Sequence, residues 1–517
     1  MTVFTSGFRL ATNTSKEIYV LEQYDVLVIG GGVNGCGIAR DAVGRGLKVA
    51  LVEQGDLAGE TSSSSTKLFH GGLRYLEYYE FGLVRKALIE REILLRNMPH
   101  IAWPMRFIIP HLKGMRPKWM LRAGLFIYDY IGGRKMLPPT KTVNLDKGPL
   151  GAPLVDSIKV GFEYSDCAVD DARLVVLNAR DAADRGAQIM VRTRFQSAKP
   201  KDGHWVANVK DIRSGKTKRI EAKVLVNAGG PWVKSIIEDR LKTETPESIR
   251  LVRGSHIVIP KLYDHDRAYF FQIADGRLVF TIPYENDFTL IGTTDVDHKG
   301  DPSNPQCSPE EAAYLCDVIS KNFKKKISTD DIVWSYAGVR PLHDSEGGDA
   351  KSASRDYEIK VREIEGSPLI NIFGGKITTY RKLSEEVAAE LAPYTQMIGK
   401  PWTHHAHLPG GDFALQQKDD LIAQFRQDFP FLDEGQVRRM FKSYGTKASE
   451  MLNGLRSAKQ MGRNFGSGLT EIEVKWLIEH EWAQTAEDVV WRRSKLGLRM
   501  TDKQVDGLDV WMKKAMP

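Results

Sequence analysis

The stretch YDVLVIGGGVNGCG, residues 24–37, decides the fold expected for this chain. Residues 25–29 form an apolar run that predicts a buried parallel strand. Gly30, Gly32 and Gly35 then fill the three glycine positions of G-x-G-x-x-G. A strand, a tight turn and a helix at this spacing direct the NH groups of the helix N-terminus towards a pyrophosphate.

An acidic residue follows this turn at the distance that nucleotide binding requires. The apolar run of residues 48–52 ends in Glu53, about 20 residues beyond the glycines, where a carboxylate accepts a hydrogen bond from a ribose hydroxyl. This version of the motif suits FAD or NAD. A βαβ turn whose glycines serve only close packing is the alternative, and the combination of strand, glycines, helix and acid favours the nucleotide.

A second block, TSSSSTKLFHGGLRYLE at residues 61–77, favours FAD over NAD. It resembles the signature of FAD-dependent glycerol-3-phosphate dehydrogenases of the aerobic, quinone-linked bacterial type. The resemblance runs from about residue 24 into the C-terminal region. Further stretches that carry it are GFEYSDCAVDDARL, LVNAGGPWV, RGSHIVIP, IGTTDVDHKGDP, AGVRPL and FGGKITTYRKL.

The resemblance implies an enzyme of glycerol metabolism that oxidises sn-glycerol 3-phosphate to dihydroxyacetone phosphate. Hydride would pass from substrate C2 to flavin N5, and the electrons would continue to a membrane quinone, with ubiquinone expected. A glycerol-3-phosphate oxidase that passes electrons to oxygen and forms hydrogen peroxide is the closest alternative. A non-catalytic, flavin-stabilised protein that binds a membrane or a partner is a third reading.

Composition limits the other function classes. Net charge is +7, from 73 basic and 66 acidic residues, but no basic tract with interleaved aromatics indicates nucleic-acid binding. The four cysteines show no C-x-x-C spacing, so we expect no metal site and a reducing, cytoplasmic compartment. No apolar run approaches the 18 or more residues of a spanning helix, and residues 1–23 are interpreted as a polar N-terminal extension.

The order of strand-like and helix-like segments predicts an α/β protein. We expect a discontinuous, Rossmann-like FAD-binding domain over residues 24–400, because its strand-like runs are widely separated in the sequence. Substrate-domain insertions, the largest at about residues 236–335, should form an antiparallel sheet. Residues 401–517 show helical spacing and should form an all-α C-terminal domain.

The resemblance assigns cofactor contacts beyond the glycine turn. Hydroxyl and NH groups of residues 62–65, here called the serine block, should lie near the pyrophosphate or flavin, and Gly229 lets the backbone approach the cofactor. Besides Gly30, Gly32, Gly35 and Glu53, the predicted cofactor-binding residues are Ser62, Ser63, Ser64, Lys67, His70, Gly229, Lys376 and Thr378.

A phosphorylated substrate requires cations, and arginine suits a dianionic phosphate because its planar fork pairs two oxygens. The resemblance places Arg74, Arg340 and Arg355 around the substrate. Tyr75 would add a phenolic hydrogen bond to the phosphate or a hydroxyl. Each arginine taken alone is more often part of a surface ion pair.

The predicted catalytic residues are His256, Arg340 and Lys376. His256 is the favoured base for the C2 hydroxyl, and His70 competes with it. Lys376 follows a strand and a double glycine, where an ammonium favours negative charge on reduced flavin or a substrate alkoxide. The alternatives are that His256 is a hydrogen-bonded structural residue and that Lys376 is a solvated lysine at a capped turn.

Residues 111–136, HLKGMRPKWMLRAGLFIYDYIGGRKM, combine basic flanks with an aromatic and aliphatic helix. This pattern suits a bilayer interface, and a core helix with solvated ends is equally consistent with the sequence. The family resemblance favours peripheral association with the cytoplasmic face of the inner (plasma) membrane. The oligomeric state stays open, with a homodimer as one possibility.

Overall fold

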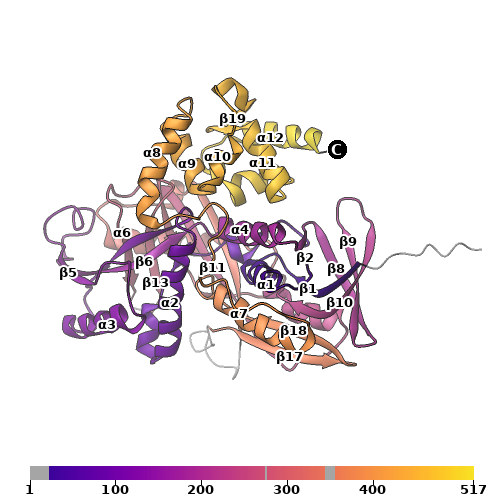
Figure 1. Ribbon diagram of the computed structural model, residues 1–517. Coiled ribbons are helices and arrows are strands. Elements are labelled where there is room, and N and C mark those ends of the chain that lie inside the picture. The colour runs from indigo at the N-terminus through magenta and orange to yellow at the C-terminus, as the bar shows by residue number, and fades with distance from the viewer. Residues whose placement is uncertain (1–21, 274–275, 344–355, 517) are drawn as a thin grey trace, which may run out of the picture.

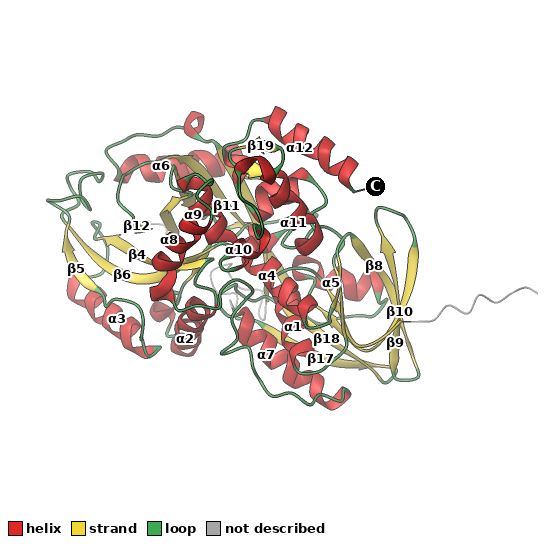
Figure 2. Ribbon diagram, turned by 45° about the horizontal axis from the view of Figure 1, so that its top comes forward, coloured by secondary structure: helices red, strands yellow, loops and turns green. Residues whose placement is uncertain are grey.

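A computed structural model of the protein describes residues 22–273, 276–343 and 356–516. Two sheets lie on opposite sides of the molecule, with helices between them and a helical C-terminal region above (Figures 1 and 2). The first sheet carries the glycine turn, and the second supplies most of the remaining strands.

The first sheet is assembled from segments that are far apart in the sequence. Its main path runs β17-β18-β10-β1-β2-β7, and all neighbouring strands along it are parallel except β17 and β18. The strands of this path are β1 (Glu22–Ile29), β2 (Val49–Val52), β7 (Gln188–Met190), β10 (Thr217–Asn227), β17 (Glu358–Ile364) and β18 (Ser367–Phe373). Two further strands, β8 (Thr193–Lys201) and β9 (His204–Asp211), extend it from β10 in antiparallel pairing.

Alternating side chains of β1 pack into two different cores. Val26 and Val28 join a core with the helices α1 (Val33–Gly44), α4 (Asp171–Asp184) and α7 (Tyr380–Leu391). Leu27 and Ile29 face the opposite side, where they join the core that contains side chains of β8 and β9. Burial on both faces explains why this strand reads as a continuous apolar run rather than an alternating one.

The second sheet has ten strands, with the main path β15-β11-β14-β13-β12-β4-β6-β3; β16 pairs with β11 and β5 with β6. Its pairings are antiparallel except that of β4 with β12. The strands are β3 (Leu68–Phe69), β4 (Ala102–Pro110), β5 (Lys141–Asn144), β6 (Val160–Val169), β11 (Ile249–Pro260), β12 (Ala268–Gln272), β13 (Leu278–Tyr284), β14 (Phe288–Gly292), β15 (Val296–Asp297) and β16 (Trp334–His343).

Helices connect and flank the second sheet. The helix α2 (Phe81–Asn97) lies between β3 and β4 of this sheet in the chain, α4 carries the chain from β6 to β7 of the first sheet, and α3 (Lys118–Ile131) lies against α2. On the sheet, α6 (Pro309–Asn322) packs its Leu315 and Ile319 side chains into a core with strand residues of β11 and β12. A capping box at Ser308 and Glu311 begins this helix.

The C-terminal region has a hydrophobic core of its own. Its elements are α8 (Lys418–Asp428), α9 (Glu434–Tyr444), α10 (Lys447–Met451), α11 (Glu471–Glu481), the π-helical turn η9 (Asp488–Arg493) and α12 (Asp502–Ala515). The side chains of Met440, Val474, Leu477 and Leu508 are fully buried within it. A short hairpin of β19 (Asn464–Gly466) and β20 (Leu469–Thr470) interrupts the helices.

Candidate active site

Two adjoining pockets lie where the two sheets meet. The first, here called the arginine pocket, has a volume of about 300 Å³ and is lined from both sheets, including Arg340 of β16 and Lys376 after β18. The second, here called the glycine pocket, has a volume of about 380 Å³ and is lined by the glycine turn and Glu53. Both pockets share Gly32 and Ser62 as wall residues, so one extended ligand can occupy both.

The glycine turn has the geometry that its spacing predicts. Gly30 has a φ of 111°, and a Cβ on it would lie 2.5 Å from the carbonyl oxygen of Ala228. A Cβ on Gly35 would lie 1.9 Å from the Gly30 carbonyl oxygen, so this glycine allows α1 to pack closely on β1. Gly32 is the N-cap of α1, and the Val33 NH donates to Ser62 Oγ at 3.0 Å.

Glu53 stands at the end of β2 and lines the glycine pocket. Its Oε2 accepts from the Gly31 NH at 2.7 Å and its Oε1 from the Gly55 NH at 2.6 Å. Burial raises the pKa of this carboxyl above its ordinary value, although the two NH donors oppose that rise. A Cβ on Gly31 would lie 2.7 Å from Glu53 Cγ, so the sequence analysis missed a glycine that this contact requires. The glycine cradle and the oriented acid fit the adenosine and pyrophosphate end of FAD.

The serine block divides between the pocket wall and the interior. Ser62 and Ser64 line the arginine pocket. Ser63 does not; its hydroxyl donates to the Glu60 carbonyl at 3.3 Å. Lys67 also lies behind the wall, where its Nζ is 2.9 Å from Asp171 Oδ1.

The predicted FAD contact of Lys67 is not supported by this position. The side chain is nearly fully buried, and Asp171 at the start of α4 satisfies its charge. Ser65 Oγ donates to the same carboxylate at 2.7 Å. The ion pair therefore fixes the end of the serine block to α4 rather than meeting a ligand.

Gly229 and Thr378, two further predicted cofactor residues, occupy different positions. Gly229 lines the glycine pocket after β10. Thr378 is buried and lines neither pocket; its Oγ1 accepts from the His70 NH at 3.3 Å. Thr378 thus holds the backbone of a residue that does line the arginine pocket.

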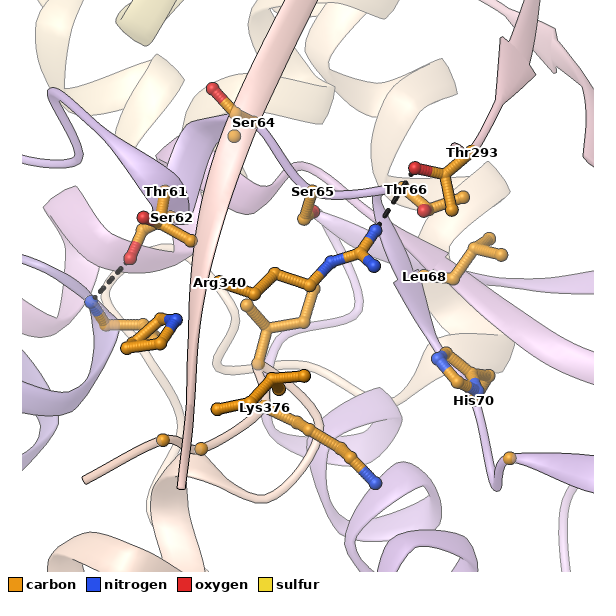
Figure 3. Close-up of a pocket in the computed structure, with 18 of the residues that line it drawn as sticks. Thr61, Ser62, Ser64, Ser65, Thr66, Leu68, His70, Thr293, Arg340 and Lys376 are labelled. Carbon is orange, nitrogen blue, oxygen red and sulfur yellow. Dashed lines mark hydrogen bonds between the residues drawn. The ribbon is translucent and has the colours of Figure 1, made fainter. Parts of the chain in front are cut away.

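Cationic side chains from three separate motifs meet at the arginine pocket. Arg74, Arg340 and Lys376 all line it, and Figure 3 shows Arg340, Lys376 and His70 arranged around one space. Arg74 also donates to the Tyr78 hydroxyl at 3.2 Å.

Arg340 is oriented by two polar partners that the sequence analysis missed. Its Nη1 lies 2.5 Å from Asp295 Oδ1, and its Nη2 donates to Thr293 Oγ1 at 3.1 Å. Both partners line the pocket and belong to IGTTDVDHKGDP, a stretch that carries the family resemblance. A guanidinium has five NH donors, so these two bonds leave donors for a ligand.

Lys376 and Tyr75 lie together in the wall of the arginine pocket. The Lys376 Nζ is 4.1 Å from the centre of the Tyr75 ring, a cation–π distance. Gly374 and Gly375 precede the lysine with φ values of 74° and 107°, which turn the chain from β18 towards α7.

The two histidines differ in access. His70 is half-buried and lines the arginine pocket, whereas His256 is fully buried and is not among the residues that line it. The Nε2 of His256 is 2.9 Å from the hydroxyl of Thr66, which does line the pocket. Its ring stacks on Tyr336 at 4.9 Å.

Electrostatics also disfavour a charged His256. Burial lowers the pKa of this imidazole well below its ordinary value, and the positive charges of Arg340 and Lys67 lower it further. The structure therefore brings His70 to the arginine pocket. His256 does not line the pocket but is hydrogen-bonded to Thr66, which does.

Arg355 lies outside the described residues, so its predicted substrate contact stays a prediction. Its neighbour Asp356 is described and lines the arginine pocket.

Comparisons with known proteins agree with this geometry. Residues 25–381 match the FAD dependent oxidoreductase family, and residues 401–513 match the C-terminal domain of alpha-glycerophosphate oxidase. The glycerol-3-phosphate dehydrogenase of Pseudomonas aeruginosa is 48% identical, with 96% of each chain covered. The aerobic glycerol-3-phosphate dehydrogenase of Escherichia coli is 46% identical, covering 95% of this chain and 98% of that protein.

Two more relatives extend the comparison. The D-erythritol 1-phosphate dehydrogenase of Brucella abortus is 45% identical, covering 96% of this chain and 98% of that protein. The crystal structure of the glycerol-3-phosphate dehydrogenase from Bacillus halodurans, complexed with FAD, superposes with a TM-score of 0.76 at 28% identity. That match covers 95% of this chain and 90% of that one.

These matches confirm the family resemblance, the α/β fold with an antiparallel substrate sheet and a helical C-terminal domain, and FAD as the cofactor. The chain belongs to the FAD dependent oxidoreductase family, and within it to the glycerol-3-phosphate dehydrogenases.

Proposed function

We propose that this protein oxidises sn-glycerol 3-phosphate to dihydroxyacetone phosphate with FAD as the hydride acceptor. The observation that carries the proposal is the arginine pocket, where Arg74, Arg340 and Lys376 line a space that adjoins the glycine pocket. Three cations beside a flavin site suit a small substrate that carries a dianionic phosphate.

Arg340 and Arg74 bind the phosphate in this proposal. Arg340 is held by Asp295 and Thr293, so its planar fork meets the substrate in one orientation. Tyr75 donates its hydroxyl to the substrate, and Arg355 completes the set of cations. A fixed fork lowers the entropy lost on binding and would hold the substrate in one orientation.

Hydride departure requires that the C2 hydroxyl lose its proton. We assign this base role to His70, because it lines the pocket and His256 does not. His256 supports the wall through Thr66. The Lys376 ammonium stabilises the negative charge that develops on the substrate oxygen or on the reduced cofactor.

Membrane quinone is the proposed electron acceptor, and α3 supports this assignment. Only Leu125, Tyr128 and Asp129 of this helix are buried, so α3 is not a core helix. Two neighbouring segments expose large apolar side chains: α3 itself, and the residues that lead into the start of α2. These side chains are Tyr78, Tyr79, Phe81, Trp119, Met120, Phe126, Ile127 and Tyr130. We call this set the α3 surface.

Charge and packing give the α3 surface the character of a bilayer interface. Lys113, Arg116, Lys118 and Lys135 flank the helix and are exposed, as anionic headgroups would require. On the inward side, α3 shares a hydrophobic core with Phe280, which lines the arginine pocket. Within the described residues, no helix is both long and apolar enough to span a bilayer.

We therefore propose peripheral attachment at the cytoplasmic face of the inner membrane, with the α3 surface in the headgroup region. A quinone dissolved in the bilayer would then approach the side of the protein nearest to the arginine pocket. A homodimer remains compatible with this arrangement.

The decisive experiment is anaerobic stopped-flow absorbance of the FAD-loaded protein mixed with sn-glycerol 3-phosphate. We expect rapid bleaching of oxidised flavin. D-erythritol 1-phosphate is the comparison substrate, because a 45% identical relative is named for it. A persistent flavin spectrum with both compounds in folded protein contradicts the proposal and favours a non-catalytic flavoprotein.

The acceptor is tested separately with reduced enzyme. Rapid reoxidation by a soluble quinone analogue, with little peroxide formed in air, is the expected result. Fast peroxide formation in detergent without quinone would identify an oxidase instead.

A further inference from the structure

The loop of residues 53–60, here called the Glu53 loop, forms one wall of the glycine pocket. Glu53 and Gly55 line the pocket on one arm and Ala58 and Glu60 on the other. Two backbone bonds hold the arms: the Ala58 NH donates to the Gly31 carbonyl at 3.1 Å, and the Arg192 NH donates to the Gly55 carbonyl at 3.0 Å. The position of Glu53 therefore depends on how this loop is fixed.

Asp56, between the two arms, points away from the pocket into the C-terminal region. Arg493 of η9 binds its carboxylate in bidentate fashion, with both N–O distances at 2.8 Å. Arg492 adds a third bond, from Nε to Oδ2, at 2.6 Å. Asp56 and Arg493 have almost no solvent exposure. We call these three residues the arginine clamp.

The arginine clamp is anchored on both sides of the loop. Asp488 binds Arg492 and also Arg192, whose backbone holds Gly55. Burial alone would raise the pKa of Asp488, but Arg492, Arg192 and Arg493 lower it to about 2, so it is ionised at neutral pH.

A second anchor reaches α4. Arg493 donates to the Glu481 carbonyl oxygen at 2.7 Å, and the Glu481 carboxylate binds both terminal nitrogens of the buried Arg173. Figure 1 shows the C-terminal helices lying over α4 and the edge of the second sheet. The clamp is thus part of a continuous buried ionic network rather than an isolated surface pair, which would contribute little.

We infer that the C-terminal helical domain is part of the FAD-binding apparatus of this protein. Asp56, Arg492 and Arg493 act as positioning residues: they touch no ligand but hold the Glu53 loop in its binding conformation. A loop that is already ordered before FAD arrives loses less conformational entropy on binding, so the clamp raises affinity for the cofactor. This inference requires FAD binding and does not depend on the substrate.

The test measures affinity for FAD in the full-length protein. Apoprotein of Asp56→Asn is titrated with FAD, and binding is followed by the change in flavin fluorescence; the rate of FAD loss from the holoprotein is measured alongside. Asp56→Asn keeps the side-chain volume but removes the charge that faces two arginines. We expect the Kd for FAD to rise at least ten-fold and FAD loss to accelerate.

The matched control is Arg499→Met. Arg499 joins the same domain to the turn between β13 and β14, through Asp287 at 2.6 Å, and lines neither pocket. The Arg499→Met substitution therefore removes a contact of the C-terminal domain and leaves the contacts of the Glu53 loop unchanged. Its Kd for FAD should stay within two-fold of that of the unchanged protein.

Arg492→Met is a milder variant for the case that Asp56→Asn does not fold. It leaves the bidentate pair of Arg493 and Asp56 in place. A rise in Kd of about three-fold or more in this folded variant supports the inference. An unchanged Kd in folded Asp56→Asn or Arg492→Met overturns it. Equal weakening by Arg499→Met also overturns it, because the effect would then be general loosening of the domain.

Discussion

Replacing Arg340 by lysine tests the assignment of the substrate phosphate most directly. The change keeps the positive charge but removes the planar fork. In the structure, Asp295 and Thr293 hold the guanidinium at 2.5 and 3.1 Å. A lysine ammonium has three donors on one atom and cannot keep both partners while it pairs two phosphate oxygens.

The expected loss follows from the bonds removed. Hydrogen bonds that involve a charged group contribute about 1.5–3 kcal/mol each. Loss of two such bonds, offset by one from the new ammonium, leaves a net deficit of one bond, about 2 kcal/mol. Since about 1.4 kcal/mol corresponds to a factor of ten, the second-order rate constant for flavin reduction should fall roughly 30-fold.

Anaerobic stopped-flow absorbance over a range of sn-glycerol 3-phosphate concentrations measures this constant. Flavin content and the Kd for FAD should not change. The control is Arg250→Lys, which alters another arginine–carboxylate pair of the second sheet, with Asp297 at 2.7 Å, that lines neither pocket. Unchanged reduction kinetics in Arg340→Lys, or an equal loss in Arg250→Lys, would refute the assignment of Arg340.

Other variants test the base, the pH response and the membrane surface. His70→Ala should slow flavin reduction at saturating substrate by at least 100-fold and His256→Ala less; the reverse order in stopped-flow traces would return the base role to His256. Burial, and then the charge of Glu53, raises the pKa of Glu60 to about 7. This folded pKa exceeds the unfolded value near 4.5, so the neutral carboxyl adds to the free energy of unfolding of the apoprotein. The contribution is complete below pH 4.5 and is lost as the pH rises through 7. Since Glu60 lines the glycine pocket, FAD affinity should likewise fall several-fold between pH 6 and 8, and Glu60→Gln should flatten that titration. Trp119→Ser should reduce sedimentation with anionic vesicles several-fold, whereas Val510→Ser, also at an exposed apolar position, should not.

Local sequence predicted the parts of the site that local geometry determines. The glycine turn and Glu53 lie within about 25 residues of one another, and their spacing follows from one strand, one turn and one helix. The arginine pocket was predictable only through the family resemblance, because Arg74 and Arg340 belong to motifs that no spacing rule connects.

The remaining differences come from partners that are distant in the sequence. Lys67 follows the serine block by two residues, yet its side chain turns inward to Asp171. His256 sits in a strand that reaches the site, but Thr66 lies between its ring and the pocket. Strand periodicity likewise gave no sign that β4 would join the substrate-side sheet through β12. These side-chain contacts and this strand pairing depend on tertiary packing, which local patterns in the sequence do not reveal.

The strand order of the first sheet has a consequence for biosynthesis. Because β18 pairs with β10, this sheet is incomplete until residue 373 has left the ribosome. The carboxylate of Asp56 meets its arginines only after residue 493 has been made. Such non-local topology slows folding and prolongs exposure of apolar strands, so the nascent chain should depend on chaperones until the helices of the C-terminal region emerge.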